Sequence, residues 1–114
     1  MRIIYLAAAA ALLALPAAAQ QALTDAELQR TIVGRTATFP DGATATWHPN
    51  GAYVYAGSRG ASTGRYAIAG GQVCVAFDNQ GGQINQNRCD RFVRSGQGLT
   101  LINGQGRSFP LRLN

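Results

Sequence analysis

Clusters of turn-forming residues recur at short intervals from Arg35 to the end of the chain, and their spacing limits what the chain can fold into. Seven such clusters, rich in Gly, Asn, Asp, Pro and Ser, separate short runs of Thr, Val, Ile, Tyr and Phe. Asn-Gly and Asp-Gly pairs favour the tight turns of β-hairpins. The pattern therefore predicts up to eight short strands, near residues 35–39, 43–48, 52–57, 62–69, 72–77, 87–94, 98–102 and 107–113.

Large apolar residues alternate with small or polar ones along several of these runs. Val73, Val75 and Phe77 alternate with Cys74 and Ala76, and the run at 107–113 alternates in the same way. One dry face and one wet face are typical of antiparallel sheets. We therefore expect a mainly β fold, a small antiparallel meander or closed barrel of 6–8 short strands with one short N-terminal helix.

The helix is predicted at about residues 24–33. Thr24 and Glu27 have the spacing of a capping box, in which each side chain accepts a hydrogen bond from the backbone amide of the other residue. Gly34 is placed to end the helix. Leu28 and Ile32, four residues apart, share one face of the helix, and we expect this face to pack against the rest of the fold.

Residues 1–19 have the layout of a secretory signal peptide, with Arg2 in a short charged region, an apolar run at 3–15 and small residues before the cleavage point. The apolar run is shorter than the roughly 20 residues that a membrane-spanning helix needs. We expect cleavage near Ala19–Gln20, which leaves a single β domain at 20–114 without a transmembrane segment. The expected location is the periplasm, or the medium after secretion.

The two cysteines, Cys74 and Cys89, both lie in the predicted mature domain. Exported proteins meet an oxidising environment, and two cysteines allow one intramolecular pairing. We predict a disulfide between them, worth about 3 kcal/mol for a loop of this length. A thiol-based metal site is the alternative, but such sites need three or four ligands and the chain has one histidine, so no metal is expected.

Every basic residue of the chain is an arginine. Removal of Arg2 with the leader leaves nine arginines and five carboxylates, which lowers the formal net charge from +5 to +4. This charge suits an anionic partner such as a phosphate, a polysaccharide, an acidic protein or a membrane surface. We expect a monomer and no nucleic-acid partner.

No set of residues in the sequence predicts catalysis. His48 is the only histidine, and no serine lies in a Gly-x-Ser-x-Gly elbow. Asp90 stands among arginines, so we expect ion pairing to lower its pKa, which is unsuitable for a general acid. We therefore expect a protein that is not an enzyme, with no catalytic residues and no cofactor.

One predicted strand carries the best candidate interaction surface. Arg88, Phe92 and Arg94 fall on the same face of this strand, together with Asp90. Arginine beside an exposed aromatic ring can bind phosphates, stack on sugars or bases, or anchor a protein partner. The alternative is a solvated outer face of a barrel.

Aromatic residues form a second group of interest, Trp47, Tyr53, Tyr55 and Tyr66. In a small barrel such rings usually fill the interior. A ligand cup is the alternative, but eight short strands leave little room beyond their own side chains.

Several motifs occur in order along the chain: Leu-Thr-x-x-Glu-Leu at 23–28, Asp-Gly at 41–42, Gly-x-Tyr at 64–66, Gly-Gly-x-Val-Cys at 70–74, and the second cysteine. With the leader, this layout resembles that of small exported bacterial proteins of unknown function. The resemblance spans most of the mature chain, and its motifs are structural. A weaker architectural similarity, in size, disulfide and compartment, is to periplasmic barrels that inhibit lysozymes or proteases.

Together these observations predict a non-enzymatic binding or interaction module at the cell envelope, with an anionic envelope component or a protein as partner. The alternative is an inhibitor of a lysozyme-like or proteolytic enzyme, which would present the segment between Cys74 and Cys89 as a rigid loop.

Overall fold

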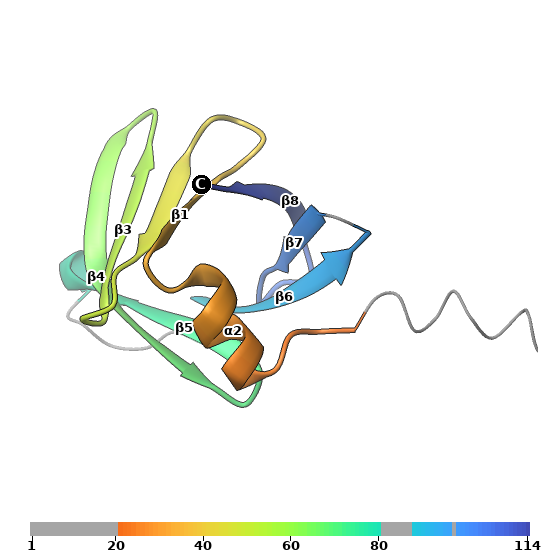
Figure 1. Cartoon of the computed structure of the whole chain (residues 1–114). Helices are drawn as coiled ribbons and strands as arrows, with labels where there is room; N and C mark the ends of the chain where they lie inside the picture. The colour runs from red at the N-terminus through yellow and green to blue at the C-terminus, as the bar shows by residue number, and fades with distance from the viewer. Residues whose placement is uncertain (1–20, 81–87, 97) are drawn as a thin grey trace, which may run out of the picture.

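Eight antiparallel strands form a closed barrel, in which each strand pairs with its neighbours in sequence and β8 returns to pair with β1 (Figure 1). This computed structural model describes residues 21–80, 88–96 and 98–114. The strands are β1 (Arg35–Thr38), β2 (Thr44–Trp47), β3 (Ala52–Gly57), β4 (Gly60–Ala69), β5 (Gln72–Phe77), β6 (Cys89–Ser95), β7 (Gly98–Ile102) and β8 (Ser108–Leu113), with the helix α2 (Asp25–Ile32) before them and a 3-10 turn, η2 (Asp78–Gln80), after β5. The predicted fold class is confirmed. The predicted leader, residues 1–19, lies outside the described residues, as do residues 81–87 of the segment between the cysteines.

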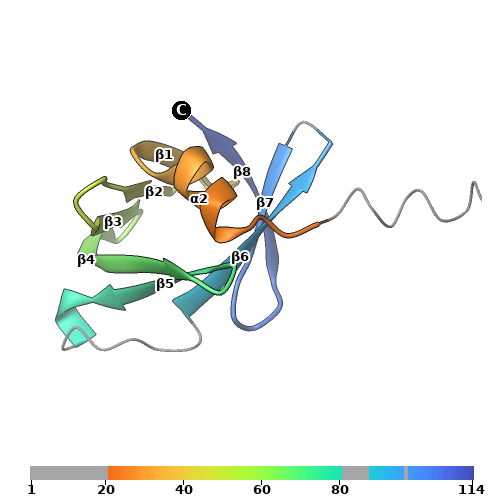
Figure 2. The same cartoon turned by 60° about the horizontal axis from the view of Figure 1, so that its bottom comes forward.

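The antiparallel order of the strands gives the barrel two distinct ends. Odd-numbered strands finish where even-numbered strands begin, so the connections after β1, β3, β5 and β7 meet at one end. The helix α2 comes directly before β1 and therefore lies at the opposite end. In Figure 2 the η2 turn, which follows β5, lies well away from α2. We refer to these as the far end and the helix end.

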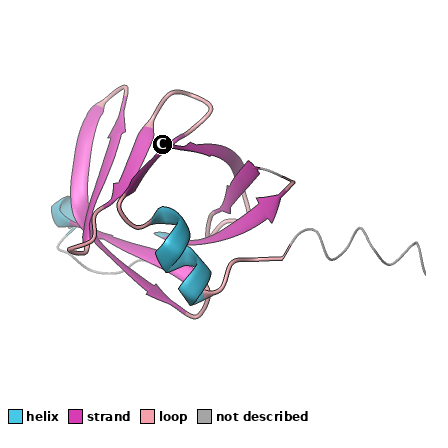
Figure 3. Cartoon of the chain, in the orientation of Figure 1, coloured by secondary structure: helices cyan, strands magenta, loops and turns pink. Residues whose placement is uncertain are grey.

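The helix α2 covers the helix end of the barrel (Figure 3). Its predicted capping box is present, because the Glu27 amide donates to the Thr24 hydroxyl at 3.2 Å and the Thr24 amide donates to the Glu27 carboxylate at 2.9 Å. Leu28 and Ile32 are fully buried in the same core as Trp47. The apolar face of the helix thus fills this half of the barrel. Among the described residues, no helix has the length and apolar character needed to cross a membrane.

Asp25 ties the first turn of α2 to the β4–β5 hairpin. The backbone amides of Gly70 and Gly71 donate to its two carboxylate oxygens at 3.2 and 2.6 Å. Both glycines have positive φ angles, of 62° and 74°, which is the backbone form that a tight two-residue hairpin needs. The sequence motif Gly-Gly therefore makes the turn, and the helix carboxylate fixes its position.

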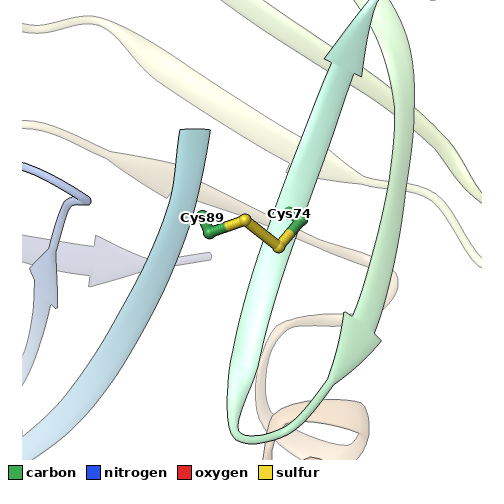
Figure 4. Close-up of a disulfide and its surroundings, with 2 residues drawn as sticks. All are labelled: Cys74 and Cys89. Atoms are coloured by element: carbon green, nitrogen blue, oxygen red, sulfur yellow. A yellow bond between two sulfur atoms is a disulfide. The ribbon is translucent and has the colours of Figure 1, made fainter. Parts of the chain in front are cut away.

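The disulfide between Cys74 and Cys89 is present, as predicted, and joins β5 to β6 (Figure 4). Among the described residues, these two strands share two paired positions, Cys74 with Cys89 and Val73 with Asp90. Further along β6, the segment before α2 pairs with this strand instead of β5: Ala22 pairs with Val93, and the Leu23 amide donates to the Phe92 carbonyl at 2.8 Å. The disulfide therefore reinforces one of the shortest ladders in the barrel.

Gly64 allows β4 to approach β5 unusually closely. A Cβ atom at this position would overlap the carbonyl oxygen of Ala76 and lie 2.9 Å from the Cα of Phe77. Both atoms belong to the backbone of the paired strand, so neither can move aside freely. The glycine of the Gly-x-Tyr motif thus has a packing role.

Candidate functional site

The far end of the barrel contains a cavity of about 610 Å³, which we call the cup. Its lining comes from both sides of the barrel and includes no residue of α2: Phe39, Pro40, Asp41, Tyr53, Tyr55, Ser62, Phe77, Asn79, Arg88, Asp90, Leu101, Asn103 and Phe109. The helix end is filled by apolar side chains, whereas the far end leaves a ligand-sized space. The predicted packing of the aromatic group in the interior is confirmed, because Trp47 and Tyr53 are buried in the core and Tyr55 packs against it. The barrel nevertheless leaves more room at its far end than expected, and Tyr53 and Tyr55 also line this space.

Five aromatic rings form much of the wall of the cup. Phe39 lies between Tyr55 and Phe109, with ring centroids 5.9 and 6.1 Å apart and edge-to-face geometry in both pairs. Tyr53 and Phe77 form another edge-to-face pair at 5.8 Å, and both are more than nine-tenths buried. Such a wall presents ring faces and edges to any guest, which suits apolar, aromatic or cationic groups.

The aromatic wall continues into the core. Tyr53 packs on Trp47 with centroids 6.0 Å apart, and Trp47 packs on Phe92 at 5.7 Å. Burial raises the pKa of Tyr53, and the nearby Asp90 carboxylate raises it further. The base of the cup is thus held by a rigid set of packed rings, and the Tyr53 hydroxyl stays protonated at neutral pH.

Asp90 is a carboxylate on the inner face of the barrel. It pairs in register with Val73, which is fully buried, and it lines the cup. Burial raises the pKa of Asp90 to about 6, and the positive charge of Arg88 opposes this shift only in part. The expectation of a lowered pKa was therefore wrong.

The reason is the geometry of β6, which separates Asp90 from two of its three neighbouring arginines. Arg91 is exposed on the outer face, because successive side chains of a strand point to opposite sides. Arg94 is four residues further along the strand, or about 13 Å. There its guanidinium donates to the Thr31 hydroxyl of α2 at 3.5 Å. Arg88 alone shares the cup with Asp90.

Arg88 lies at the edge of the cup, directly before β6. Its side chain is exposed, and its guanidinium carbon lies 5.1 Å from the centroid of the Phe77 ring. This distance is within the range of a cation–π interaction. The aromatic wall of the cup therefore already faces one cationic group.

The three residues predicted as an interaction surface do not form one. Phe92 has no exposed area and packs on Trp47, so the expectation that it is exposed was wrong. Arg88 lines the cup, and Arg94 contacts α2 at the opposite end. The alternation had grouped these residues on one face correctly, but closure of the barrel turned that face inward.

His48 and Tyr66 lie apart from the cup. His48 is exposed in the β2–β3 turn, and its carbonyl oxygen accepts a hydrogen bond from the Tyr66 hydroxyl at 2.6 Å. Burial raises the pKa of this tyrosine. Of the predicted aromatic group, Trp47 and Tyr53 belong to the core, Tyr55 and Tyr66 pack against it, and Tyr53 and Tyr55 also line the cup. In the described part of the chain, no three potential metal ligands of the His, Cys, Asp or Glu type come together.

Sequence reasoning missed the contribution of Phe39 and Phe109 to the cup. Each lies beside a connection that meets the others at the far end, Phe39 just after β1 and Phe109 near the start of β8. Phe77 lies at the end of β5 in the same way. In an up-and-down barrel every second connection lies at the same end, so residues beside the first, third, fifth and seventh connections come together there. Phe39, Phe77 and Phe109 all lie beside such connections. That signal was available in the sequence.

Comparisons with protein-family models, curated proteins and solved structures find no match to this chain.

Proposed function

We propose that the protein is a non-enzymatic binding protein of the cell envelope that takes a small molecule into the cup. The observation that carries this proposal is a cavity of about 610 Å³ at one end of a barrel whose other end is filled. Sites for small molecules typically measure about 300–1,000 Å³.

The composition of the wall supports the same proposal. Most of the lining is aromatic or aliphatic, and a few polar groups, among them Asp90, Arg88 and Ser62, are distributed around it. Small-molecule sites commonly combine an apolar wall, which supplies affinity, with a few polar groups that fix orientation. The cup differs from a filled core because its aromatic rings pack against each other around the cavity and leave it open.

The cell-envelope location rests on the sequence and on the disulfide. The leader at 1–19 predicts export, and a disulfide persists in oxidising compartments such as the periplasm. The resemblance to small exported bacterial proteins of unknown function agrees with this location. A mass of the protein purified from the periplasm that corresponds to cleavage near Ala19–Gln20 would support it, and an intact leader would contradict it.

Binding of N-phenyl-1-naphthylamine, a neutral apolar dye whose fluorescence rises in apolar sites, tests the proposal. The wild-type protein should bind the dye, and Ser62→Trp should abolish binding because the indole would occupy the cup. Ser108→Trp is the matched control, since Ser108 is exposed and does not line the cup. Absence of binding to folded wild-type protein, or equal binding by both variants, would contradict the proposal.

The alternative, an inhibitor of a lysozyme-like or proteolytic enzyme, remains a hypothesis from the sequence. Half of its candidate loop, the segment between Cys74 and Cys89, falls on residues 81–87, which lie outside the described residues.

A further inference from the structure

We propose that the cup selects molecules that carry a protonated amine on an apolar or aromatic body, with Asp90 as the counterion and the aromatic rings as the wall. This inference rests on the proposed function and adds the chemical class of the ligand.

The position of Asp90 is the first argument. Its partner in the β5–β6 ladder, Val73, is fully buried, and side chains that pair directly across two strands point to the same side of the sheet. Asp90 therefore projects into the barrel between the packed core and the cup. A carboxylate in this position offers a negative charge at the inner part of the site, where a guest is removed from water.

The second argument is the energetic cost of that carboxylate. Burial disfavours the charged form of Asp90, and the attraction of Arg88 does not compensate fully. A neutral side chain of the same shape would avoid this cost. A bound ammonium group would restore the lost interaction, since opposite charges attract more strongly where water is excluded.

The aromatic wall gives the third argument. Ring faces attract cations, and quaternary ammonium ligands are recognised by cages of several aromatic rings. Arg88 already places its guanidinium over Phe77. Tyr53, Phe77 and Asp90 all line the cup, and the charge of Asp90 acts on Tyr53, which packs edge-to-face on Phe77, so one guest can contact both the rings and the carboxylate.

The distribution of charge argues against an anionic guest. Among the described residues that line the cup, Arg88 is the one cationic side chain, and it is exposed at the edge of the cup. The other charged lining residues are the carboxylates Asp41 and Asp90. An anion that entered far enough to contact Tyr53 would meet Asp90 and would be repelled.

A matched set of three indoles tests the inference: tryptamine, which is cationic, tryptophol, which is neutral, and indole-3-propionate, which is anionic. Calorimetric titration of the wild-type protein near neutral pH should give at least tenfold tighter binding of tryptamine than of tryptophol, and the weakest binding for the anion. Asp90→Asn should remove the preference for tryptamine and leave the affinity for tryptophol within about twofold.

Asp41→Asn is the control for a carboxylate at the edge of the cup. Asparagine keeps the oxygen that accepts a hydrogen bond from the Ala43 amide at 3.0 Å, so the turn is preserved while one charge is lost. This variant should change the preference for tryptamine by less than about threefold, because an exposed charge is screened by water and salt.

The affinity for tryptamine should also fall as the pH is lowered through about 6, the pKa of Asp90, because the protonated carboxyl no longer attracts the amine. The other titratable groups that line the cup are Asp41, Arg88, Tyr53 and Tyr55. Arginine and tyrosine side chains titrate far above this range. The Asp41→Asn variant should therefore keep the pH dependence, and Asp90→Asn should lose it.

Equal affinities for tryptamine and tryptophol, or tightest binding of the anion, would overturn the inference and leave the proposed function in place. Binding of N-phenyl-1-naphthylamine without binding of tryptamine would have the same meaning. Failure of the dye and of all three indoles to bind would instead refute the proposed function itself.

Discussion

Replacement of Asp90 by asparagine should stabilise the folded protein at neutral pH. The carboxylate lines the cup on the inner face of β6, and burial raises its pKa from the ordinary value of 3.8 to about 6. Asparagine has nearly the same shape and no charge to desolvate. The change therefore removes the cost of a buried negative charge while it keeps the packing around Tyr53 and Val73.

The magnitude follows from the difference in proton binding between the folded and unfolded chains. Because the pKa of Asp90 is raised in the folded state, the folded chain binds the proton more tightly than the unfolded chain does. The stability that comes from this proton binding is fully present below about pH 3.8 and is lost as the pH rises through about 6. Each pH unit in this interval corresponds to about 1.4 kcal/mol, so the total loss is about 3 kcal/mol at neutral pH. This value is an upper limit for Asp90→Asn, since the new amide must also find hydrogen-bond partners.

Urea unfolding with the disulfide intact measures the effect. Trp47 is the only tryptophan and is almost fully buried, so its fluorescence reports loss of the core. The free energy of unfolding should be similar for the two proteins near pH 4, and should become larger for Asp90→Asn than for wild type as the pH rises to about 7. Asp41→Asn serves as the control and should show no such divergence.

A constant difference between Asp90→Asn and wild type across this pH range would refute the reasoning. So would a variant that is less stable than wild type at neutral pH, because the carboxylate would then be stabilised by contacts stronger than the cost of its burial.

Three further changes test the fold. Gly64→Ala should lower the free energy of unfolding by about 2 kcal/mol or more in the same urea assay. Gly98→Ala is the control and should lower it much less, because a Cβ at Gly98 would meet nothing closer than 3.5 Å. Equal losses of stability in the two variants would contradict the close approach of β4 to β5. Joint replacement of Cys74 and Cys89 by alanine should cost about 3 kcal/mol, and an unchanged unfolding midpoint would show that the disulfide is not a stabilising link. Asp25→Ala should lower the free energy of unfolding by about 1 kcal/mol, because the hydrogen bonds from the β4–β5 turn to this carboxylate are lost. An unchanged melting temperature would argue against this role of Asp25.

Local features of the fold were predictable because they depend on residues close together in the chain. The spacing of Thr24 and Glu27 determines the start of α2, and each hairpin turn depends on a few neighbouring glycine or asparagine residues. The disulfide was predictable for a different reason, since the chain has two cysteines and these allow only one intramolecular pairing.

The candidate site was less predictable because it depends on which face of each strand becomes the interior. In β6, charged residues occur on both faces, so charge alone did not distinguish them. The large ring of Phe92 decides the orientation, because it fills the space beside Trp47. Once Phe92 points inward, strand alternation places Asp90 inside as well.

The sequence by itself determined the strands, the helix with its capping box and the cysteine pair, since short-range chemistry specifies each of them. It also determined that Asp90, Phe92 and Arg94 of β6 share one face, together with Arg88 directly before the strand. Only the tertiary structure decided that this face is inward and that Phe39 and Phe109 meet Asp90 around a cup. The physical reason is that barrel closure brings together residues distant in the chain, while α2 fills one end and leaves the other with a cavity.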